Sequence, residues 1–273
     1  MANADKVPFD KDSLSNTFLV AVVMCLLCSV IVSGVAVALK PAQLLNKELD
    51  RKQNILRAAG MLSEDSVVDN AGRGVDELFA EFEVRVVDLA SGQYRDDIDP
   101  ATFDPVRSAK DPDVSIALAP QNDPATLRRR ENASIVYIRR QQGQIDKLVL
   151  PVRGYGLWGT LFGYLALDAD LQTISGLGFY QHKETPGLGG EVDNPDWKAG
   201  WPGVALFDST GQPGVRLVKR RRAASDPRAA FEVDALSGAT FTTRGVQNLV
   251  NFWTGDMGFG PYIQRLKADL AAG

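Results

Sequence analysis

An uninterrupted apolar run close to the N-terminus limits what this chain can fold into. Residues 18–39 contain no charged side chain. As a helix rising about 1.5 Å per residue they would extend roughly 33 Å, enough for a hydrocarbon core of about 30 Å. Ala36 and Ala38 resemble a signal-peptide cleavage site, but the run exceeds the usual apolar region of about 7–15 residues. We predict a retained single transmembrane helix over residues 18–39, after a short tail over residues 1–17.

The charges around this span leave its orientation open. Two basic residues precede it and five follow it: Lys6, Lys11, Lys40, Lys47, Arg51, Lys52 and Arg57. The positive-inside rule would place the following residues in the cytoplasm. That rule applies to short loops, however, and long domains translocate largely regardless of charge.

The composition of the rest of the chain suits one substantial soluble domain, with or without an N-terminal elaboration. A net charge of −4 and a pI of about 5.2 disfavour nucleic acid as a partner. We interpret the short basic runs at residues 128–130 and 219–222 as solvated surface.

Both cysteines, Cys25 and Cys28, fall inside the apolar run. We interpret them as small packing residues, although two thiols on one helix could instead approach a metal held by neighbouring membrane proteins. The rest of the chain has no cysteine and only one histidine, His182, which argues against a disulfide scaffold and against zinc or haem ligation. We predict no metal site in this chain.

The pattern of the remaining residues predicts an α+β fold. Helices are expected at residues 43–61, 75–82, from 240 onward and at 262–270, and an Asp- and Pro-rich loop at 96–124. Runs rich in β-branched and aromatic residues predict strands at 134–138, 147–152, 161–168, 173–180, 203–207 and 215–219. Successive strands with helices at both ends favour an antiparallel sheet flanked by helices, and no Rossmann nucleotide motif is present.

The segment from Asp234 to Thr240, D-A-L-S-G-A-T, carries the strongest chemical signal. It offers hydroxyls, an acid and very small side chains. Val246, Leu249, Val250 and Trp253 then recur with helical spacing. The free N–H groups and the dipole of a helix that begins here would favour a phosphate.

Two glycine-rich loops share this unusual residue choice. Residues 154–159 read G-Y-G-L-W-G and residues 182–190 read H-K-E-T-P-G-L-G-G. Glycine lets backbone amides approach a ligand closely, and Tyr155, Trp158 and Leu188 could form an apolar wall. Three such segments around one sheet predict a pocket of flavin size.

These motifs resemble the FMN-binding domain family, in which FMN is bonded through its phosphate to the last threonine of D-x-x-S-G-A-T. E-T-P-G-L-G, at residues 184–189, is similar to a second element of that family. The resemblance extends to the C subunits of bacterial sodium-translocating NADH:quinone oxidoreductases through N-I-L-x-A-A-G, G-Y-G-L-W, G-L-G-G-E-V-D-N-P and S-G-A-T-x-T-x-x-G-V. It covers most of the chain and is weakest at residues 96–124 and 220–228.

The resemblance implies a helical, loop-rich part over residues 40–140, an FMN-binding domain over 141–260 and a C-terminal helix over 261–273. It implies one covalent FMN on Thr240, with Asp234 recognised by a flavin transferase. The other residues that it places at the cofactor are Ser237, Gly238, Ala239, Glu184, Thr185, Leu188, Lys219, Leu157 and Trp158.

The resemblance also implies a function. The chain would relay electrons between a membrane iron centre and another FMN, within a six-subunit, sodium-pumping NADH:ubiquinone oxidoreductase of the bacterial inner membrane. Its soluble domain would face the periplasm, and it would have no complete activity alone. Two alternatives are the flavinylated G subunit of an Rnf-type ferredoxin:NAD complex and a membrane-anchored binding module without a cofactor.

Overall fold

The computed structural model describes residues 13–272, and the chain divides into two units. One unit ends at Asp50 and the other begins at Arg51. Lys6, Lys11 and most of the expected tail over residues 1–17 lie outside the described residues.

The N-terminal apolar run forms part of one long helix, α1 (Leu14–Ala58). Its apolar window has a mean hydropathy of 2.8, and among the described residues it is the one helix long and apolar enough to cross a membrane. The separate helix expected at residues 43–61 is a continuation of α1, which runs through Pro41 without a break. The predicted end near Gly60 is confirmed, because α1 ends at Ala58 and Gly60 has a φ of 69°.

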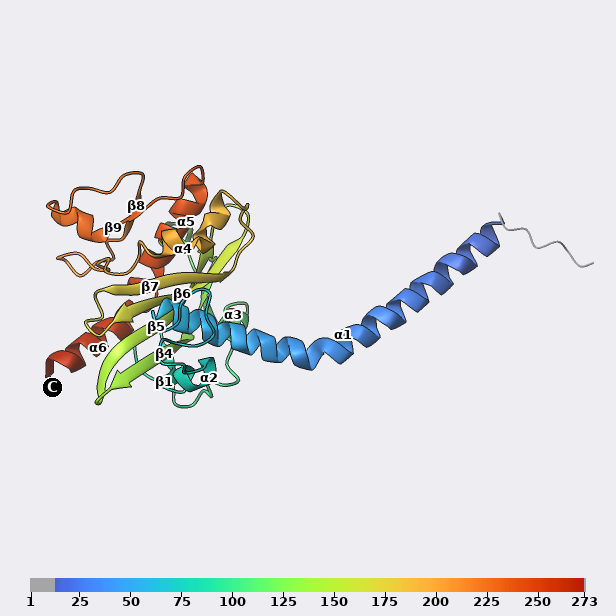
Figure 1. The fold of residues 1–273 in the computed structure, drawn as a ribbon, viewed down its shortest axis with the longest axis horizontal. Helices are drawn as coiled ribbons and strands as arrows, with labels where there is room; N and C mark the ends of the chain where they lie inside the picture. The colour runs from blue at the N-terminus through green and yellow to red at the C-terminus, as the bar shows by residue number, and fades with distance from the viewer. Residues whose placement is uncertain (1–12, 273) are drawn as a thin grey trace, which may run out of the picture. The chain divides into compact units, whose positions relative to one another are not determined.

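The second unit is built on an antiparallel sheet with strand order β1-β4-β5-β6-β7 (Figure 1). Its strands are β1 (Phe82–Asp88), β4 (Ala133–Gln141), β5 (Gln144–Tyr155), β6 (Thr160–Asp168) and β7 (Ile174–Gln181). All neighbouring strands pair antiparallel. The predicted fold class is therefore confirmed for this sheet.

Each face of the sheet has its own apolar core. The side chains of Leu148 and Leu150 share one core with the helices α5 (Thr240–Thr254) and α6 (Gly260–Ala272). Val149, between them on β5, shares the other core with Ile55 and Leu56 at the end of α1. Because successive side chains of a strand point to opposite faces of the sheet, neighbouring residues of β5 pack against different helices.

The remaining elements are short. Two small sheets pair β2 (Ser115–Ala117) with β3 (Arg129–Glu131) in antiparallel orientation, and β8 (Arg216–Val218) with β9 (Glu232–Asp234) in parallel. The short helices are α2 (Val75–Phe79), α3 (Pro105–Ser108), α4 (Pro195–Lys198) and the 3₁₀ turns Pro112–Val114, Pro120–Asn122, Gly189–Asp193 and Pro227–Phe231. Several of these lie in the stretch that was expected to be loop.

Two sequence expectations about the elements of this unit were wrong. The helix expected over residues 75–82 ends at Phe79, and Phe82 begins the edge strand β1, which was not predicted. Residues 203–207 form only isolated bridges, Thr173↔Ala205 and Phe207↔Pro213. Their backbone N–H groups donate hydrogen bonds to residues outside the sheet strands, from Ala205 N to Ala230 O and from Leu206 N to Gln172 O.

The basic run at residues 128–130 lies only partly on the surface. Arg128 is exposed, and Arg129, the first residue of β3, is half-buried. Arg130 is buried at 4% exposure, and its Nη1 donates to Met257 O at 2.7 Å. The expectation of a solvated run was therefore wrong for Arg130.

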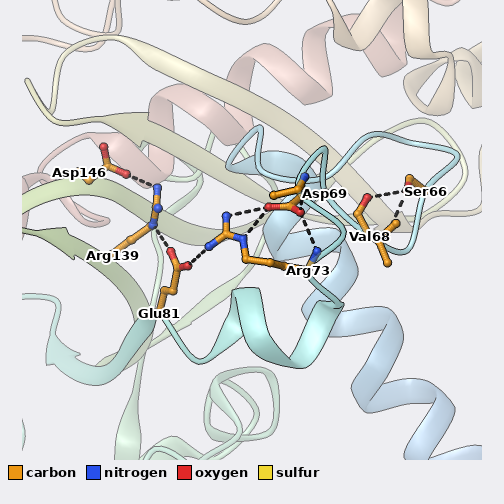
Figure 2. A network of polar contacts seen from close by, with 8 residues as sticks. Ser66, Val68, Asp69, Arg73, Glu81, Arg139 and Asp146 are labelled. Carbon is orange, nitrogen blue, oxygen red and sulfur yellow. Dashed lines mark hydrogen bonds and ion pairs between the residues drawn. The ribbon is translucent and has the colours of Figure 1, made fainter.

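A chain of ion pairs ties the segment after α1 to the sheet (Figure 2). Arg73 contacts Asp69 at 2.7 Å and Glu81 at 2.6 Å. Glu81 also meets Arg139 on β4 at 2.7 Å, and Arg139 reaches Asp146 on β5 at 2.6 Å. Hydrogen bonds from the Arg73 backbone and side chain hold the pKa of Asp69 below its usual value.

Candidate functional site

The segment 234–240 joins β9 to α5 and leaves Thr240 exposed at the first position of the helix. Among the described residues, no side chain caps this helix end, where Ala239 occupies the N-cap position. Gly238 has a φ of 73°, which favours glycine. The N–H groups of the first turn are thus available to a bound anion.

Four hydroxyls lie in or just after this segment, and only two of them are exposed. Thr242 and Thr243 are buried at 1% and 7% exposure. Thr242 Oγ1 donates to Glu184 Oε2 at 2.5 Å, and Thr243 Oγ1 accepts from Leu236 N at 3.1 Å. Ser237 and Thr240 are exposed, so these two hydroxyls are accessible for a covalent bond.

The strand β8 runs beside α5 and carries Lys219 toward the same end. Leu217 N donates to Gln247 Oε1 at 2.9 Å, and Asn251 Nδ2 donates to Val215 O at 3.0 Å. Four residues of helix and two of strand each advance about 6 Å. Lys219 is exposed and directly follows the last residue of β8, so the chain runs toward the first turn of α5 at this point.

Glu184 joins three parts of the site. Its side chain is buried, and Oε1 accepts from the backbone N–H groups of Leu157 and Trp158, each at 3.0 Å. Its other oxygen accepts from Thr242 on α5. The loop after β5, the segment after β7 and the start of α5 are thereby held together. With its oxygens engaged in this way, Glu184 positions the backbone around the site.

Exposed apolar side chains surround this junction. Leu157 is 42% exposed, Trp158 62% and Leu188 46%. A Cβ added to Gly238 would lie 3.0 Å from Leu188 Cδ2, so Leu188 lies against the segment that precedes Thr240. Phe241, which was not among the residues predicted for the site, is 63% exposed directly after Thr240. The sequence signal that could have indicated it is an aromatic residue directly after a motif of small residues.

Thr185 lies in the turn that shapes the loop after β7. It is exposed, and its carbonyl oxygen accepts from Leu188 N at 3.1 Å and from Gly190 N at 2.9 Å. His182 Nε2 lies 2.7 Å from Asp193 Oδ2 across the same loop. The hydrogen bonds to Thr185 O and the contact between His182 and Asp193 therefore stabilise the loop that carries Leu188.

Comparisons with known proteins identify the family of the chain. Residues 156–255 match the family model described as FMN-binding domain. The chain is 48% identical over 94% of its length to the C subunit of the Na(+)-translocating NADH-quinone reductase of Pseudomonas aeruginosa, and it covers 98% of that protein. It is 46% identical to the C subunit of the same reductase of Yersinia pestis, over 97% of both chains. The chain belongs to the family of C subunits of the Na(+)-translocating NADH-quinone reductases.

Solved structures of this family, NqrC, share the fold. The crystal structure of NqrC from Shewanella oneidensis matches with a TM-score of 0.71 and 35% identity, over 82% of this chain and 99% of that one. The corresponding protein from Parabacteroides distasonis matches with a TM-score of 0.61 and 27% identity, over 82% and 96%. The resemblance to the NqrC family is thus confirmed, and these relatives favour it over the Rnf-type alternative.

The described residues fit an FMN group. An uncapped helix end with an exposed hydroxyl suits a phosphate, and a nearby unburied Lys219 adds positive charge. The exposed side chains of Leu157, Trp158 and Leu188 offer a surface for a flat aromatic ring.

Proposed function

We propose that the chain carries one FMN, covalently attached through its phosphate to Thr240, and serves as an electron-transfer protein. The observation that carries this proposal is the pairing of an exposed Thr240 hydroxyl with the uncapped N-terminus of α5. Bound FMN supplies one-electron redox chemistry, and the protein supplies its position and environment.

The attachment requires a separate flavin transferase, because an unassisted threonine hydroxyl is a poor nucleophile. In the transferase, Thr240 Oγ1 would give its proton to a base of that enzyme and form a bond to the flavin-side phosphorus of FAD, while the bond from that phosphorus to the AMP portion would break and AMP would leave. No oxidation or reduction occurs in this step. The exposed Asp234, six residues before Thr240, is proposed as part of the surface that the transferase recognises.

The remaining site residues divide between the two ends of the cofactor. Ser237 by its hydroxyl, Gly238 and Ala239 by their backbone, and Lys219 by its charge would hold the phosphate. Leu157, Trp158, Leu188 and Thr185 would contact the ring and the ribityl chain. Glu184 would keep these groups in place through its bonds to Leu157 N, Trp158 N and Thr242.

The proposed setting is a six-subunit, sodium-pumping NADH:ubiquinone oxidoreductase, in keeping with the names of the relatives. The protein would pass electrons between a membrane iron centre and another FMN. Residues 18–39 of α1 would lie in the lipid bilayer of the inner membrane as the anchor, and the second unit would face the periplasm. A covalent bond suits that side, where no pool of free FMN could replace a lost cofactor.

Mass spectrometry of the tryptic peptide 229–244 tests the attachment. This peptide contains all four hydroxyls of the site, so fragmentation must locate the added mass of FMN minus water. We expect it on Thr240, with no adduct in Thr240→Ala and a retained adduct in the matched variant Ser237→Ala. An adduct retained in Thr240→Ala, or a peptide of unmodified mass from a host with the transferase, would refute the proposal. In-gel flavin fluorescence of the denatured protein distinguishes it from a binding module without cofactor.

A further inference from the structure

A cavity lies beside the connection from β5 to β6, and its lining residues Arg153 and Thr160 flank the loop 154–159 of the candidate FMN site. Its volume is about 290 Å³, and it lies between α3, the segment 126–129 and the ends of β5 and β6. None of its lining residues belongs to the segments 154–159, 182–190 or 234–243 that form the candidate FMN site. A volume of this size is near the lower end for small-molecule sites.

Four basic residues line this cavity: Lys110, Arg128, Arg129 and Arg153. None of its lining residues is acidic. One of the four charges is already compensated, because Arg153 pairs with the fully buried Glu131. The other three basic side chains give the lining of the cavity its positive charge.

These three have no carboxylate partner among residues 13–272. Arg129 donates from Nε to Ser115 Oγ and from Nη2 to Ser115 O, each at 3.0 Å, and both acceptors are neutral. Lys110 and Arg128 are exposed and make no ion pair within that range. Three positive charges therefore line one concave surface, and none of them has an ion-pair partner among the described residues, an arrangement that attracts anions.

A carboxylate close to Arg128 along the chain, that of Asp123, is used by the backbone. Asp123 accepts from Leu127 N at 2.8 Å and from Arg128 N at 2.6 Å. These bonds hold Arg128 at a φ of 66° and accompany a φ of 55° at Thr126, a left-handed conformation that is uncommon for such residues. Local strain of this kind clusters at ligand sites. The loop thus keeps Arg128 at the cavity while leaving its guanidinium unpaired.

The cavity also has an apolar part. Val106, Leu127 and Phe162 line it together with the basic residues. The ring of Phe162 packs against that of Tyr180 in a tilted arrangement, with ring centroids 6.2 Å apart. A ligand that matches both parts carries an anionic group and a small apolar group.

We propose that this cavity binds a phosphate group attached to a small apolar moiety. Arginine forks and a lysine ammonium together match the several oxygens of a phosphate, whereas a carboxylate offers only two. Val106, Leu127 and Phe162 contact the apolar moiety. The phosphate can come from a soluble phosphate ester or from a phospholipid headgroup, and the chemistry recognised is the same.

Calorimetric titration of the full chain in an uncharged detergent and a phosphate-free, low-salt buffer tests this site. The probes are inorganic phosphate, phenyl phosphate, benzoate and dihexanoyl phosphatidylglycerol. The test variant is Lys110→Gln with Arg128→Asn, because asparagine tolerates the left-handed conformation. The matched control is Arg216→Gln with Arg221→Gln, which removes two exposed positive charges elsewhere.

We expect one saturable site for phenyl phosphate, with inorganic phosphate and benzoate each weaker by about fivefold or more. The test variant should weaken binding about tenfold and the control less than about twofold. If the lipid binds more tightly than phenyl phosphate, the source is a headgroup; if it binds more weakly, the source is a soluble ester. Both results support a phosphate site.

Three results would overturn the proposal: no saturable binding, an equal loss in the two double variants, or benzoate binding as tight as phenyl phosphate. An unfolding midpoint close to that of the wild type shows that the test variant is folded. Should it not fold, Lys110→Gln alone is expected to weaken phenyl phosphate binding about threefold. An unchanged affinity in that single variant would also contradict the site.

Discussion

The hydroxyl of Thr242 donates to Glu184 Oε2 at 2.5 Å and so joins the first turn of α5 to the loop after β7. Both residues are buried, at 1% and 5% exposure. Because Thr240 is two residues before Thr242 on the same helix, this bond fixes the helix end that we propose as the flavin attachment site. Glu184 therefore acts on the site through the backbone that it orders.

Replacing Glu184 by alanine should destabilise the second unit by about 3 kcal/mol. The change leaves the part-buried N–H groups of Leu157 and Trp158 and the buried hydroxyl of Thr242 without their acceptor. An unsatisfied buried group costs about 1–3 kcal/mol, and the two N–H groups add less because water can reach their loop. Urea unfolding of the full chain, followed by near-UV circular dichroism, measures the loss. Glu184→Gln is the control: its amide can accept both N–H bonds and donate to Thr242, so about 1 kcal/mol is expected. Equal stability of Glu184→Ala and the wild type would contradict this role.

Replacing Gly245 by alanine should separate α5 from the loop after β5. A Cβ at Gly245 would lie 2.4 Å from Tyr155 O and 3.0 Å from Gly156 Cα. These are backbone atoms that cannot rotate away, so we expect a loss of about 2–3 kcal/mol in the free energy of unfolding. Gly178 is the matched control, because nothing lies within 4 Å of a Cβ added there. Gly178→Ala should be neutral or slightly stabilising, and an equal loss in the two variants would exclude the close approach as the cause.

Much of the fold could be predicted from the sequence, because its strands carry strong local patterns. The strands expected at residues 134–138, 147–152 and 161–168 all lie within observed strands. The edge strand β1 was missed because Glu83 and Arg85 interrupt its apolar residues, and these form an ion pair at 3.0 Å on the strand. Charged side chains on an edge strand protect the sheet from pairing with another chain. The same charged residues interrupt the apolar pattern by which a strand is predicted.

The candidate site could be predicted as a set of motifs but not as a geometry. The sequence indicated that Glu184, Leu157 and Thr240 belong together, since each lies in a glycine-rich or small-residue segment. It could not show that the two oxygens of Glu184 bond to the loop and to α5, because those bonds join residues 26 to 58 positions apart. The apolar run at 203–207 was wrongly predicted as a strand for a related reason. Its buried residues Val204 and Leu206 fill the core from an irregular segment, which local pattern does not distinguish from a strand.

Tyr180 should make the protein sensitive to alkaline pH. Partial burial of Tyr180, which is 43% exposed, and then the nearby phenol of Tyr137 raise the pKa of Tyr180 to about 12, whereas tyrosine in an unfolded chain has a pKa of about 10. The folded state thus favours the neutral phenol. Its contribution to stability is complete below pH about 10 and is lost as the pH rises to about 12. Burial also raises the pKa of Tyr164, whose ring centroid is 5.2 Å from that of Tyr180.

Thermal unfolding midpoints of the full chain between pH 9 and 12.5 test this expectation. Tyr180→Phe should unfold at nearly the same temperature as the wild type at pH 7 and should lose less stability between pH 10 and 12. A pH profile of Tyr180→Phe that coincides with the wild type would show that this phenol does not contribute. The absorbance of tyrosinate near 295 nm gives an independent record of the same titration.

The buried pair of Glu131 and Arg153 should show strong coupling in a double-mutant cycle. Glu131 is fully buried, Arg153 is 9% exposed, and Arg153 Nη1 donates to Glu131 Oε1 at 2.8 Å while Nη2 contacts the other oxygen. Removing one partner leaves an uncompensated buried charge, so Glu131→Gln and Arg153→Met should each lose about 3 kcal/mol or more in the free energy of unfolding. In the double variant neither charge remains, and the loss should be smaller than the sum by at least about 2 kcal/mol. Urea unfolding of the four proteins gives this difference directly. Additive losses would mean that Arg153 is held by its contact with the Trp253 ring, 4.9 Å from the centroid, and that the ion pair adds little.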